Sequence, residues 1–470
     1  MKRMENMRKK ALVFLDYDIV VRHFVLSGVF DELQKDFDVS FVFHHDSTSE
    51  KQGIHHDPAK LRIENAEIFE LPRARMGSWY KMFAITSLNR QLGTKNFWPL
   101  RQRIAKAIGS TGWWRTTLFS LIALPGIFQL YRYRYLQKQG VYEPLMNFVR
   151  DRKPDVILQP TLLAGFFIND LSLVSKLLGI PFIAMMNSWD NPSLKAVATE
   201  FPRKLVVWGE QTRGHAIKYM GMPPDDVEMF GAAQFQIYRK PVTESDAELR
   251  QMFGVPEDLP IVLYAGVAKS VNESRHLKLL DEAISRGDIQ PCHIIYRPHP
   301  WRGRLIEGEQ SFFDMTFNHT TMDPHLVDRY RGIAEKPTLV MEMADYDVTR
   351  KLMHLITAAI SPLSTMMLEV IMHEKPVMSF FPQEDMNSKF GKSTNISFRL
   401  AHFQGFFDCP GIQRVSRQVE LPSAVNKMID DADDPEIRSA LAKHADFYVV
   451  RDGPTYGQRL AELAGELAGR

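Results

Sequence analysis

The chain has 470 residues, of which 45% are apolar, 58 are Lys or Arg and 56 are Asp or Glu. This length exceeds that of one ordinary core, so two globular domains are expected, and the near-zero net charge gives no general attraction to nucleic acid. Cys292 and Cys409 are the two cysteines, which excludes a disulfide framework or a cysteine-based zinc site and is typical of a reduced compartment.

The first apolar run, residues 11–21, contains Asp16 and Asp18. The core of a signal peptide tolerates such charges poorly, so we expect a cytoplasmic protein. Short apolar runs then alternate with amphipathic segments that end at glycines suited to helix C-caps. The first half has predicted helices at 169–179 and 212–221 and predicted strands at 11–15, 39–43, 66–71, 155–160, 180–186, 204–208 and 227–231.

The second half repeats this alternation. Continuous apolar strands separated by helices indicate a parallel sheet covered on both faces. The sequence therefore predicts an α/β protein with two Rossmann-like doubly wound parallel-sheet domains, joined near the polar residues 235–245. Neither half carries the G-x-G-x-x-G dinucleotide fingerprint. The second half has predicted helices at 276–287 and 364–374 and predicted strands at 261–267, 292–298, 338–343, 357–362 and 376–381.

His299 follows the predicted strand 292–298, in the stretch CHIIYRPHPW. Ligands of open parallel sheets bind beyond the carboxyl ends of the strands, so we expect His299 to face a binding crevice. Pro298 and Pro300 restrict the loop on both sides, while Arg297 and Trp301 supply a cation and a flat surface. A rigid turn whose histidine satisfies a backbone group explains the same motif.

A second polar group of residues follows the predicted strand 357–362. Ser361 is expected at the N-cap of the next helix, with Pro362 as its first residue. Ser364 and Thr365 add hydroxyl groups to the free N–H groups of the first turn, which favours phosphate binding. Simple helix capping is the competing explanation. Together with His299, these residues predict a ligand site at one edge of the sheet.

The segments YRPHP (296–300) and ISPLSTMMLEVIMHEKPVMSF (360–380) resemble the nucleotide-binding half of GT-B glycosyltransferases. The likeness is to the bacterial branch with a His-Pro motif and a Ser/Thr motif, which includes sialyltransferases, capsule polymerases and polyol-phosphate transferases. It extends to residues 187–196 and 204–235 and covers about a quarter of the chain. The resemblance implies two domains facing a central crevice, with a nucleotide-sugar donor on the second and an acceptor on the first.

The resemblance also implies domain boundaries. The first domain spans residues 1–240 with a helical insertion at about 80–150, the donor-binding domain spans 241–430, and residues 431–470 form C-terminal helices that pack back on the first domain. His299 would contact the donor phosphate or the leaving nucleotide, and Ser364 and Thr365 would hold the phosphate. Donor contacts are also predicted for Arg297, Gly266, Lys269, Ser270, Ser361 and Glu369.

One departure bears on the stereochemistry of the transfer. Many retaining GT-B enzymes place two glutamates eight positions apart on this helix, whereas Glu369 and Glu374 are five apart. We therefore expect an inverting enzyme, with Glu369 binding ribose hydroxyls, although a solvent-exposed glutamate is the alternative. Lys269 is placed to pair with a diphosphate, and a surface lysine is the alternative there.

An inverting transfer needs a general base for the acceptor hydroxyl. The candidate catalytic residues of the first half are Asp18 and His23, with Asp16 and Arg22 beside them, and Asp190 in the loop after a later strand. The sequence does not rank them. The repeated DYD spacing at 16–18 and 345–347 is too short to indicate a metal, and the 15 histidines show no H-E-x-x-H spacing. No cofactor and no metal are expected.

Residues 96–140 contain three tryptophans and seven Arg or Lys but no acidic residue. The uncharged core, 116–130, is shorter than the roughly 20 residues needed to span a bilayer. Basic, tryptophan-rich and apolar character suits contact with an anionic membrane surface, which would place the protein beside a lipid-linked acceptor at the inner face of the cytoplasmic membrane. A hairpin packed on the first domain or an oligomer contact is an equal alternative.

The sequence as a whole predicts a metal-independent, inverting glycosyltransferase for a bacterial surface glycan or glycolipid. Its partners would be a nucleotide sugar, a glycan or lipid-linked acceptor and an anionic membrane surface, with no nucleic acid. A non-hydrolysing sugar-nucleotide 2-epimerase and a polyol-phosphate transferase are enzyme alternatives, although the glycine-rich phosphate loop of the epimerases is not found. A non-catalytic nucleotide-sugar-binding protein is the third class.

Overall fold

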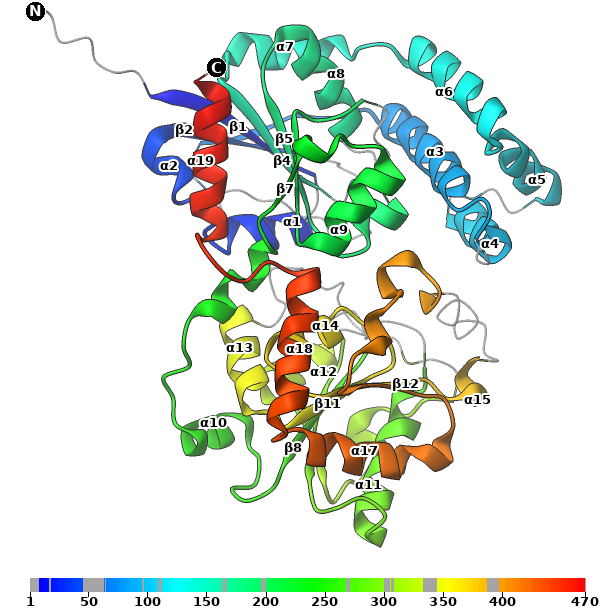
Figure 1. The fold of residues 1–470 in the computed structure, drawn as a ribbon, viewed down its shortest axis with the longest axis vertical. Coiled ribbons are helices and arrows are strands. Elements are labelled where there is room, and N and C mark those ends of the chain that lie inside the picture. Colours follow the sequence, from blue (N-terminus) through cyan, green and yellow to red (C-terminus); the bar gives the residue numbers. More distant parts are fainter. Residues whose placement is uncertain are drawn as a thin grey trace, which may run out of the picture. The chain divides into compact units, whose positions relative to one another are not determined.

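The computed structural model divides into two units, residues 1–236 with 448–470 (unit 1) and residues 237–447 (unit 2). Each unit is built on its own sheet (Figure 1). The structure describes residues 8–16, 18–44, 63, 65–94, 97–107, 109, 112–161, 163, 167–195, 200–267, 271–299, 305, 308–332, 345–386 and 397–469.

Unit 1 holds a parallel sheet in the order β3-β2-β1-β4-β5-β6-β7. Its central strands are continuous apolar runs that are buried on both faces, as expected of a parallel sheet covered on both sides. The strands are β1 (Lys9–Leu15), β2 (Phe37–Phe43), β3 (Ala66–Ile68), β4 (Val156–Thr161), β5 (Phe182–Met186), β6 (Lys204–Val207) and β7 (Val227–Met229).

Helices cover both faces of the unit 1 sheet. One face packs in a single core with α1, α2 and the C-terminal α19. On the other face, α8 contacts β4 and β5, and Phe148 of α7 packs edge-on against Phe14 of β1. The helices of unit 1 are α1 (Asp18–Val20), α2 (Leu33–Asp36), α3 (Arg73–Arg90), α4 (Phe97–Ala107), α5 (Trp113–Ile122), α6 (Pro125–Gln139), α7 (Glu143–Arg152), α8 (Ile168–Leu178), α9 (Glu210–His215) and α19 (Tyr456–Ala468).

Unit 2 repeats the architecture with a parallel sheet in the order β10-β9-β8-β11-β12-β13. Alternate residues of these strands pack in one core with α11 and α17. The intervening residues, such as Leu263, Ile295 and Ala359, are buried too, so the opposite face is also covered. The strands are β8 (Ile261–Ala265), β9 (His293–Arg297), β10 (Thr320–Met322), β11 (Ala358–Ser361), β12 (Val377–Phe380) and β13 (Ile412–Val415).

Unit 2 helices connect these strands in the alternation that the sequence predicts. At α11, Asn272 caps the start through a hydrogen bond to the N–H of Arg275, and Gly287 ends the helix in the left-handed region. The helices are α10 (Asp246–Phe253), α11 (Glu273–Arg286), α12 (Val327–Gly332), α13 (Tyr346–Leu355), α14 (Met366–Met372), α15 (Gln383–Met386), α17 (Leu421–Asp431) and α18 (Pro435–Tyr448).

The predicted fold class, two doubly wound parallel sheets, is confirmed. Two short strands of unit 2, β10 and β13, were not predicted, because their sequences TTM and IQRV carry little apolar signal. The strand predicted at 338–343 lies outside the described residues.

Candidate active site

Each sheet has one switch point, where the chain connections leave in opposite directions. It lies between β1 and β4 in unit 1 and between β8 and β11 in unit 2. Ligands of open parallel sheets bind beyond the carboxyl ends of the strands that flank such a point. The candidate site parts are therefore the unit 1 edge (described residues of 16–25, 159–163 and 187–191) and the unit 2 edge (described residues of 265–273, 297–299 and 361–369).

Asp16 lies directly after β1 at the unit 1 edge and is 1% exposed. Its Oδ2 accepts hydrogen bonds from Gln159 Nε2 and Thr161 Oγ1 of β4, each at 3.1 Å. Among the described residues, Asp16 Oδ1 has no hydrogen-bond partner. Burying an unpaired carboxyl oxygen costs free energy, so this atom is a candidate ligand contact.

Burial raises the pKa of Asp16 from its ordinary 3.8 to about 7, because removal from water disfavours the charged form. The hydrogen bonds from Thr161 and Gln159 favour the carboxylate and limit this rise. A carboxyl group that titrates near pH 7 can exchange a proton at neutral pH, which is what general acid–base catalysis requires.

His23 lies in η1 (Val21–Val25), and its Nδ1 is 2.8 Å from Asn187 Oδ1, just beyond β5. An amide oxygen accepts hydrogen bonds but cannot donate them, so Nδ1 carries the proton and Nε2 is the basic nitrogen. Burial and the charge of Arg22 lower the pKa of His23 to about 3. The ring is therefore neutral at physiological pH.

The loop after β5 fixes Asn187. Asn191 Oδ1 accepts hydrogen bonds from the backbone N–H groups of Asn187 at 3.1 Å and Ser188 at 2.8 Å. Asn191 Nδ2 donates to Asp190 Oδ1 at 3.2 Å. Two predicted catalytic residues, His23 and Asp190, thus lie at the same sheet edge, linked through this loop.

Three predicted site residues cannot be placed with their side chains. Asp18 begins α1, but its side chain lies outside the described residues. Lys269 and Ser270, in the loop between β8 and α11, also lie outside them. Their roles stay predictions.

Three neighbouring strands end level with one another at the unit 2 edge. Tyr264 of β8 pairs with Tyr296 of β9 and with Ile360 of β11, so the next residues, Arg297 and Ser361, end their strands at the same level. Strands are about 4.8 Å apart, so the backbones of β9 and β11 are separated here by roughly 10 Å. His299, two residues past β9 and half-buried, and Ser364 therefore follow strands on either side of β8.

Arg297 is 7% exposed and is paired within unit 2. Its Nη1 lies 3.2 Å from Asp323 Oδ2, and its Nη2 donates to Thr349 Oγ1 at 2.7 Å. Burial opposes ionisation of Asp323, but the charge of Arg297 and hydrogen bonds from His325 keep the pKa of Asp323 below its ordinary value. Unit 2 itself thus compensates the guanidinium charge, and the predicted donor contact of Arg297 stays a prediction.

Gly266 follows β8 at a place where a side chain would collide. A Cβ there would lie 2.6 Å from Glu273 Oε2. Glu273 is 1% exposed, and its carboxylate accepts from the N–H of Val267 at 2.6 Å and from the hydroxyl of Tyr296 at 2.7 Å. Close packing against Glu273 therefore explains why a glycine stands at position 266. Its predicted donor contact is a separate hypothesis that stays a prediction.

The helix after β11 begins later than predicted. Thr365 occupies the N-cap position of α14, and Ser361 is the last residue of β11. The prediction that Ser361 caps the helix is wrong, because Ser361 still pairs with Ser379 in β12 and the Ser379 hydroxyl donates to the carbonyl of Pro362. The Oγ atoms of Ser361 and Ser364 are 3.0 Å apart, so the two hydroxyl groups form a hydrogen bond that holds Ser364 in position.

Ser364 is half-buried and Thr365 is exposed, so a ligand can reach both hydroxyl groups. Glu369, one turn further, accepts a hydrogen bond from the hydroxyl of Tyr238. Burial and the neighbouring charge of Glu369 raise the pKa of Tyr238 well above 10, so the phenol keeps its proton. The predicted contact of Glu369 with ribose stays a prediction.

A buried network of hydrogen bonds in unit 2 was not predicted from the sequence. Tyr264 Oη is 2.7 Å from His276 Nδ1, His276 Nε2 is 2.7 Å from Asp385 Oδ2, and Arg275 Nη2 donates to Asp385 Oδ1 at 2.9 Å. The available signal was a histidine on the apolar side of the predicted helix. Asp385, the partner of His276, lies 109 positions away. The contact between them could be predicted only if the order of the strands in the sheet were known.

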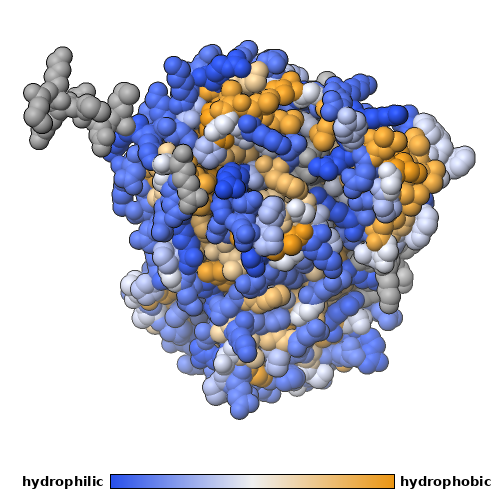
Figure 2. Space-filling model, turned by 45° about the horizontal axis from the view of Figure 1, so that its top comes forward, coloured by the Kyte–Doolittle hydropathy of each residue, from blue (hydrophilic) through white to orange (hydrophobic). Residues whose placement is uncertain are grey.

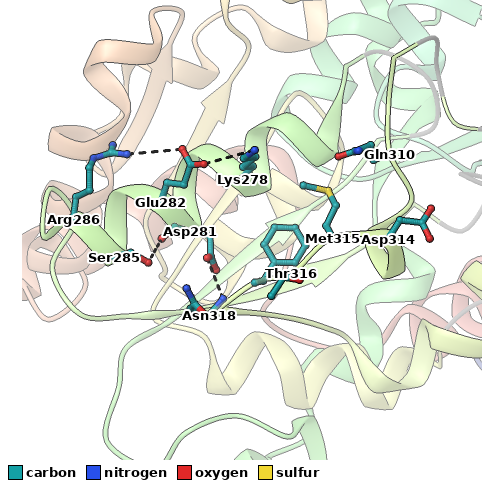
Figure 3. Close-up of a pocket in the computed structure, with 11 residues that line it drawn as sticks. Lys278, Asp281, Glu282, Ser285, Arg286, Gln310, Asp314, Met315, Thr316 and Asn318 are labelled. Atoms are coloured by element: carbon teal, nitrogen blue, oxygen red, sulfur yellow. Dashed lines mark hydrogen bonds and ion pairs between the residues drawn. The ribbon is translucent and has the colours of Figure 1, made fainter.

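A cavity of about 410 Å³ lies along the later turns of α11 and residues 310–318 (Figure 3). Its side chains are largely engaged with one another: Glu282 lies between Lys278 and Arg286, at 3.8 and 3.9 Å, and Asp281 accepts from the N–H of Asn318 at 3.1 Å. None of the predicted site residues that the structure describes lines it. Within the described part of the chain, no group of three or more His, Cys, Asp or Glu could hold a metal ion.

No protein-family model matches the chain, and no curated protein matches it. Among solved structures, the chain is similar to UDP-GlcNAc 2-epimerase from Neisseria meningitidis bound to UDP-GlcNAc, with 11% identity, 97% of this chain and 100% of that chain covered, and a TM-score of 0.47. It is similar to the wall teichoic acid polymerase TagF, with 10% identity, 98% and 89% covered, and 0.49. It is also similar to HepE from Anabaena in complex with UDP, with 13% identity, 97% and 100% covered, and 0.42. With TM-scores below 0.5, none of these likenesses assigns an activity.

Proposed function

We propose that the protein is a GT-B glycosyltransferase, inverting and independent of metal and cofactor, that transfers a sugar from a nucleotide-activated donor to a surface-glycan or glycolipid acceptor. The observation that carries the proposal is the complementary chemistry of two sheet edges. One presents a buried carboxyl group that titrates near pH 7 beside a neutral histidine, and the other presents hydroxyl groups beside a histidine. A transferase needs both kinds of site.

The donor is proposed to bind at the unit 2 edge. Ser364 and Thr365 would donate hydrogen bonds to its phosphate, and His299 would stabilise the charge that develops on the leaving nucleotide. The strand register supports this assignment, because it brings the ends of β9 and β11 to one row on either side of β8. The lesser proposed donor contacts are Gly266, Lys269, Ser270, Arg297, Ser361 and Glu369.

The acceptor is proposed to bind at the unit 1 edge, with its hydroxyl near Asp16. The unpaired Oδ1 of this carboxyl and its pKa of about 7 support Asp16 as the general base. His23, neutral with Nε2 as its basic nitrogen, and Asp190 would orient the acceptor. Asp18 remains an alternative base.

A lipid-linked acceptor would fit the surface of α4, α5 and α6. Trp113 is 80% exposed and Trp98 is 62% exposed, and Figure 2 shows hydrophobic groups gathered on the side where α5 and α6 lie. The guanidinium of Arg115 lies 4.9 Å from the ring centre of Trp114. Tryptophan with arginine is typical of segments that lie at a lipid surface. The other large apolar residues that are exposed in the described part of 97–139 are Trp114, Leu118, Leu121, Leu124, Ile127, Leu130 and Tyr133.

The same helices also pack within unit 1. Phe128 of α6 lies in a core with Trp79 and Met82 of α3, and Leu100 of α4 lies in another with Leu88 of α3. Packing on the first domain thus accounts for one side of the segment and leaves its exposed tryptophans unexplained. In the described part of the chain, no helix combines the length and apolar character needed to cross a bilayer. We propose peripheral contact with the inner face of the cytoplasmic membrane.

The proposal is tested by incubating the full chain with UDP-, CMP- and CDP-linked donors. Thermal shift reveals which donor binds, and mass spectrometry follows that donor with and without an acceptor extract. Acceptor-dependent release of the nucleotide with a new glycosylated product is the expected result. Inversion at C2 of the sugar would indicate an epimerase, transfer of a polyol phosphate would indicate that transferase class, and binding without turnover would indicate a non-catalytic protein.

Membrane contact makes a separate prediction. Sedimentation with phosphatidylglycerol vesicles should fall severalfold as salt rises, because surface charge attraction is screened over about 8–10 Å near physiological ionic strength. Replacing Trp113 and Trp114 by alanine should remove most of the binding at low salt. Leu26→Ala is a matched control, since Leu26 is an exposed apolar residue of unit 1 that lies outside α4, α5 and α6. If the protein does not bind the vesicles even at low salt, membrane contact is contradicted.

A further inference from the structure

Gln159, on β4 of unit 1, makes one side-chain hydrogen bond and keeps an unused acceptor. It is 0% exposed, and its Nε2 donates to Asp16 Oδ2 at 3.1 Å. An ionised carboxylate accepts hydrogen bonds and does not donate them, so this contact fixes which end of the amide faces Asp16. Within the described part of the chain, the other end of the amide, Oε1, has no hydrogen-bond partner. Gln159 therefore holds an unpaired oxygen inside unit 1.

Thr161 belongs to the same group of side chains. Its Oγ1 accepts a hydrogen bond from the N–H of Leu163 at 3.1 Å and donates to Asp16 Oδ2 at 3.1 Å. Asp16 Oδ2 thus accepts two hydrogen bonds. Asp16 Oδ1, like Gln159 Oε1, has no partner among the residues that the structure describes. Two buried oxygens, on two side chains that are joined by a hydrogen bond, therefore lack donors.

The backbone beside this group is strained. Leu163 is fully buried and has a φ of 56°, in the left-handed region that is unfavourable for residues with a Cβ. In this conformation its N–H donates to Thr161 Oγ1, which orients the Thr161 hydroxyl toward Asp16. Backbone strain of this kind is typical of sites where binding groups are held in place.

The two unpaired oxygens define what a ligand must supply. Buried oxygens without donors destabilise the protein alone. A ligand that meets both oxygens has to donate two hydrogen bonds from neighbouring atoms, because the two side chains are in direct contact. It has to be free of negative charge at that point, since Asp16 Oδ1 shares the charge of the carboxylate. Hydroxyl groups meet these requirements and are small enough to reach buried side chains.

We propose that the acceptor presents two neighbouring hydroxyl groups, a vicinal diol, to the unit 1 edge. One hydroxyl donates to Asp16 Oδ1 and the other donates to Gln159 Oε1, so Gln159 selects the acceptor. This inference rests on the proposed function, because it names the chemical class of the acceptor at that site. Sugars and polyols carry such pairs of hydroxyl groups, whereas a monohydric alcohol lacks the second donor.

Ligand-observed NMR with the full chain tests the proposal at pH 8, where Asp16, with a pKa of about 7, is mostly ionised. The probes are cis- and trans-1,2-cyclohexanediol, trans-2-methoxycyclohexanol, cyclohexanol and cyclohexylamine. The methoxy oxygen accepts hydrogen bonds but cannot donate them, so this probe is matched to the diols in shape and polarity. At least one diol should bind about tenfold more tightly than the two monohydric alcohols, because these leave Gln159 Oε1 unpaired.

Gln159→Met removes the proposed second contact. Methionine has about the shape of glutamine but no amide, so the variant should bind the diols and the monohydric alcohols equally. Gln413→Met is the matched control, since Gln413 also lies on a strand and donates through Nε2 to a backbone carbonyl, that of Ala424 in unit 2. It should keep the preference for the diol. If Gln159→Met does not fold, the comparison of probes on the unaltered chain still tests the proposal.

Four results would overturn the proposal. They are equal binding of diols and monohydric alcohols by the unaltered chain, a diol preference that persists in Gln159→Met, tighter binding of cyclohexylamine, which indicates a cationic ligand, and no binding of any probe, which indicates a water molecule at the two oxygens. Probe binding requires neither a nucleotide sugar nor turnover. Its failure is therefore distinct from failure of the proposed function, which the thermal shift with nucleotide-linked donors measures.

Discussion

The unit 1 edge and the unit 2 edge occupy the same place in two similar sheets but carry opposite chemistry. At the unit 1 edge, burial displaces pKa values: that of Asp16 rises to about 7 and that of His23 falls to about 3. At the unit 2 edge, the arginine is paired with Asp323 and accessible hydroxyl groups follow β11. Groups whose pKa values are pushed apart suit proton transfer, whereas fixed hydroxyl groups suit binding.

The comparison shows that sheet architecture does not assign the roles. Both sheets have the same strand order around their switch points. The difference comes from the few residues that follow each strand, because those residues decide whether a charge is buried, paired or exposed. Variants at the two edges should therefore fail in different ways.

The largest effect is expected for Asp16→Asn. The amide keeps the shape of the carboxyl but cannot accept a proton, so kcat should fall by about 10² to 10⁴-fold, which is the usual contribution of a general base. The activity of the unaltered protein should rise with pH through about 7, and the residual activity of the variant should not. Asp155→Asn is the control, since Asp155 lies at the opposite end of β4. Unchanged kcat in Asp16→Asn would exclude it as the base.

The raised pKa of Asp16 also predicts how the free energy of unfolding depends on pH. Its pKa is raised from 3.8 unfolded to about 7 folded, so between these values the folded state binds more protons than the unfolded state. The contribution to stability is full below pH 4 and is lost as pH rises to 7, by about 4 kcal/mol in all. Urea unfolding at several pH values should show this decline, and Asp16→Asn should lack it. Parallel curves would contradict the raised pKa.

A second effect, about 10²-fold in kcat, is expected for His299→Ala, because a group that stabilises developing charge is lost. The loop should keep its fold, since the backbone of Pro298 restricts it without the imidazole. His293→Ala is the control at the other end of β9, where Nε2 lies 2.9 Å from Thr321 Oγ1. Circular dichroism and kinetics separate the outcomes. Unfolding of His299→Ala would favour a structural histidine.

The smallest effect concerns donor affinity. Replacing Ser364 and Thr365 by alanine should weaken donor binding by tenfold or more, because hydrogen bonds to a phosphate are removed. Stability should change little, since Thr365 makes no side-chain cap to α14. Calorimetric titration of the nucleotide sugar measures the change, and equal affinity would remove the phosphate site.

Ser361→Ala is the matched control for that double variant. Ser361 is buried at the end of β11 and lies 3.0 Å from Ser364 through their Oγ atoms. Its alanine variant should lose about 1 kcal/mol of unfolding free energy with a smaller loss of affinity. If Ser361→Ala instead lost affinity and kept its stability, the donor contact would be assigned to Ser361 at the strand end and not to the loop.

Much of the fold was predictable because buried parallel strands are continuous apolar runs. The error at Ser361 shows the limit of local signals. A Ser-Pro pair is typical of a helix start, but pairing with β12 extends the strand through Ser361. Whether such a residue ends a strand or caps a helix is decided by its neighbour in the sheet, which the local sequence does not contain.

The site was predictable only in outline, for a related reason. Asp16 stood beside Asp18 and His23 with nothing in the sequence to rank them. Its environment comes from Gln159 and Thr161, which lie 143 and 145 positions away. Once β4 is known to lie beside β1, these contacts and the burial that raises the pKa follow together.

The chain passes from unit 1 into unit 2 and returns to unit 1, so α19 is synthesised long after the rest of unit 1. Tyr456, Leu460 and Leu467 complete the same core as β1 and α2. Residues 8–236 therefore leave the ribosome without the helix that closes one face of their sheet. Unit 2 is available in full earlier, at residue 447. One face of the first sheet therefore lacks the packing of α19 over that whole interval, since Tyr456 is made 220 positions after Gln236, whose side chain accepts its backbone hydrogen bond.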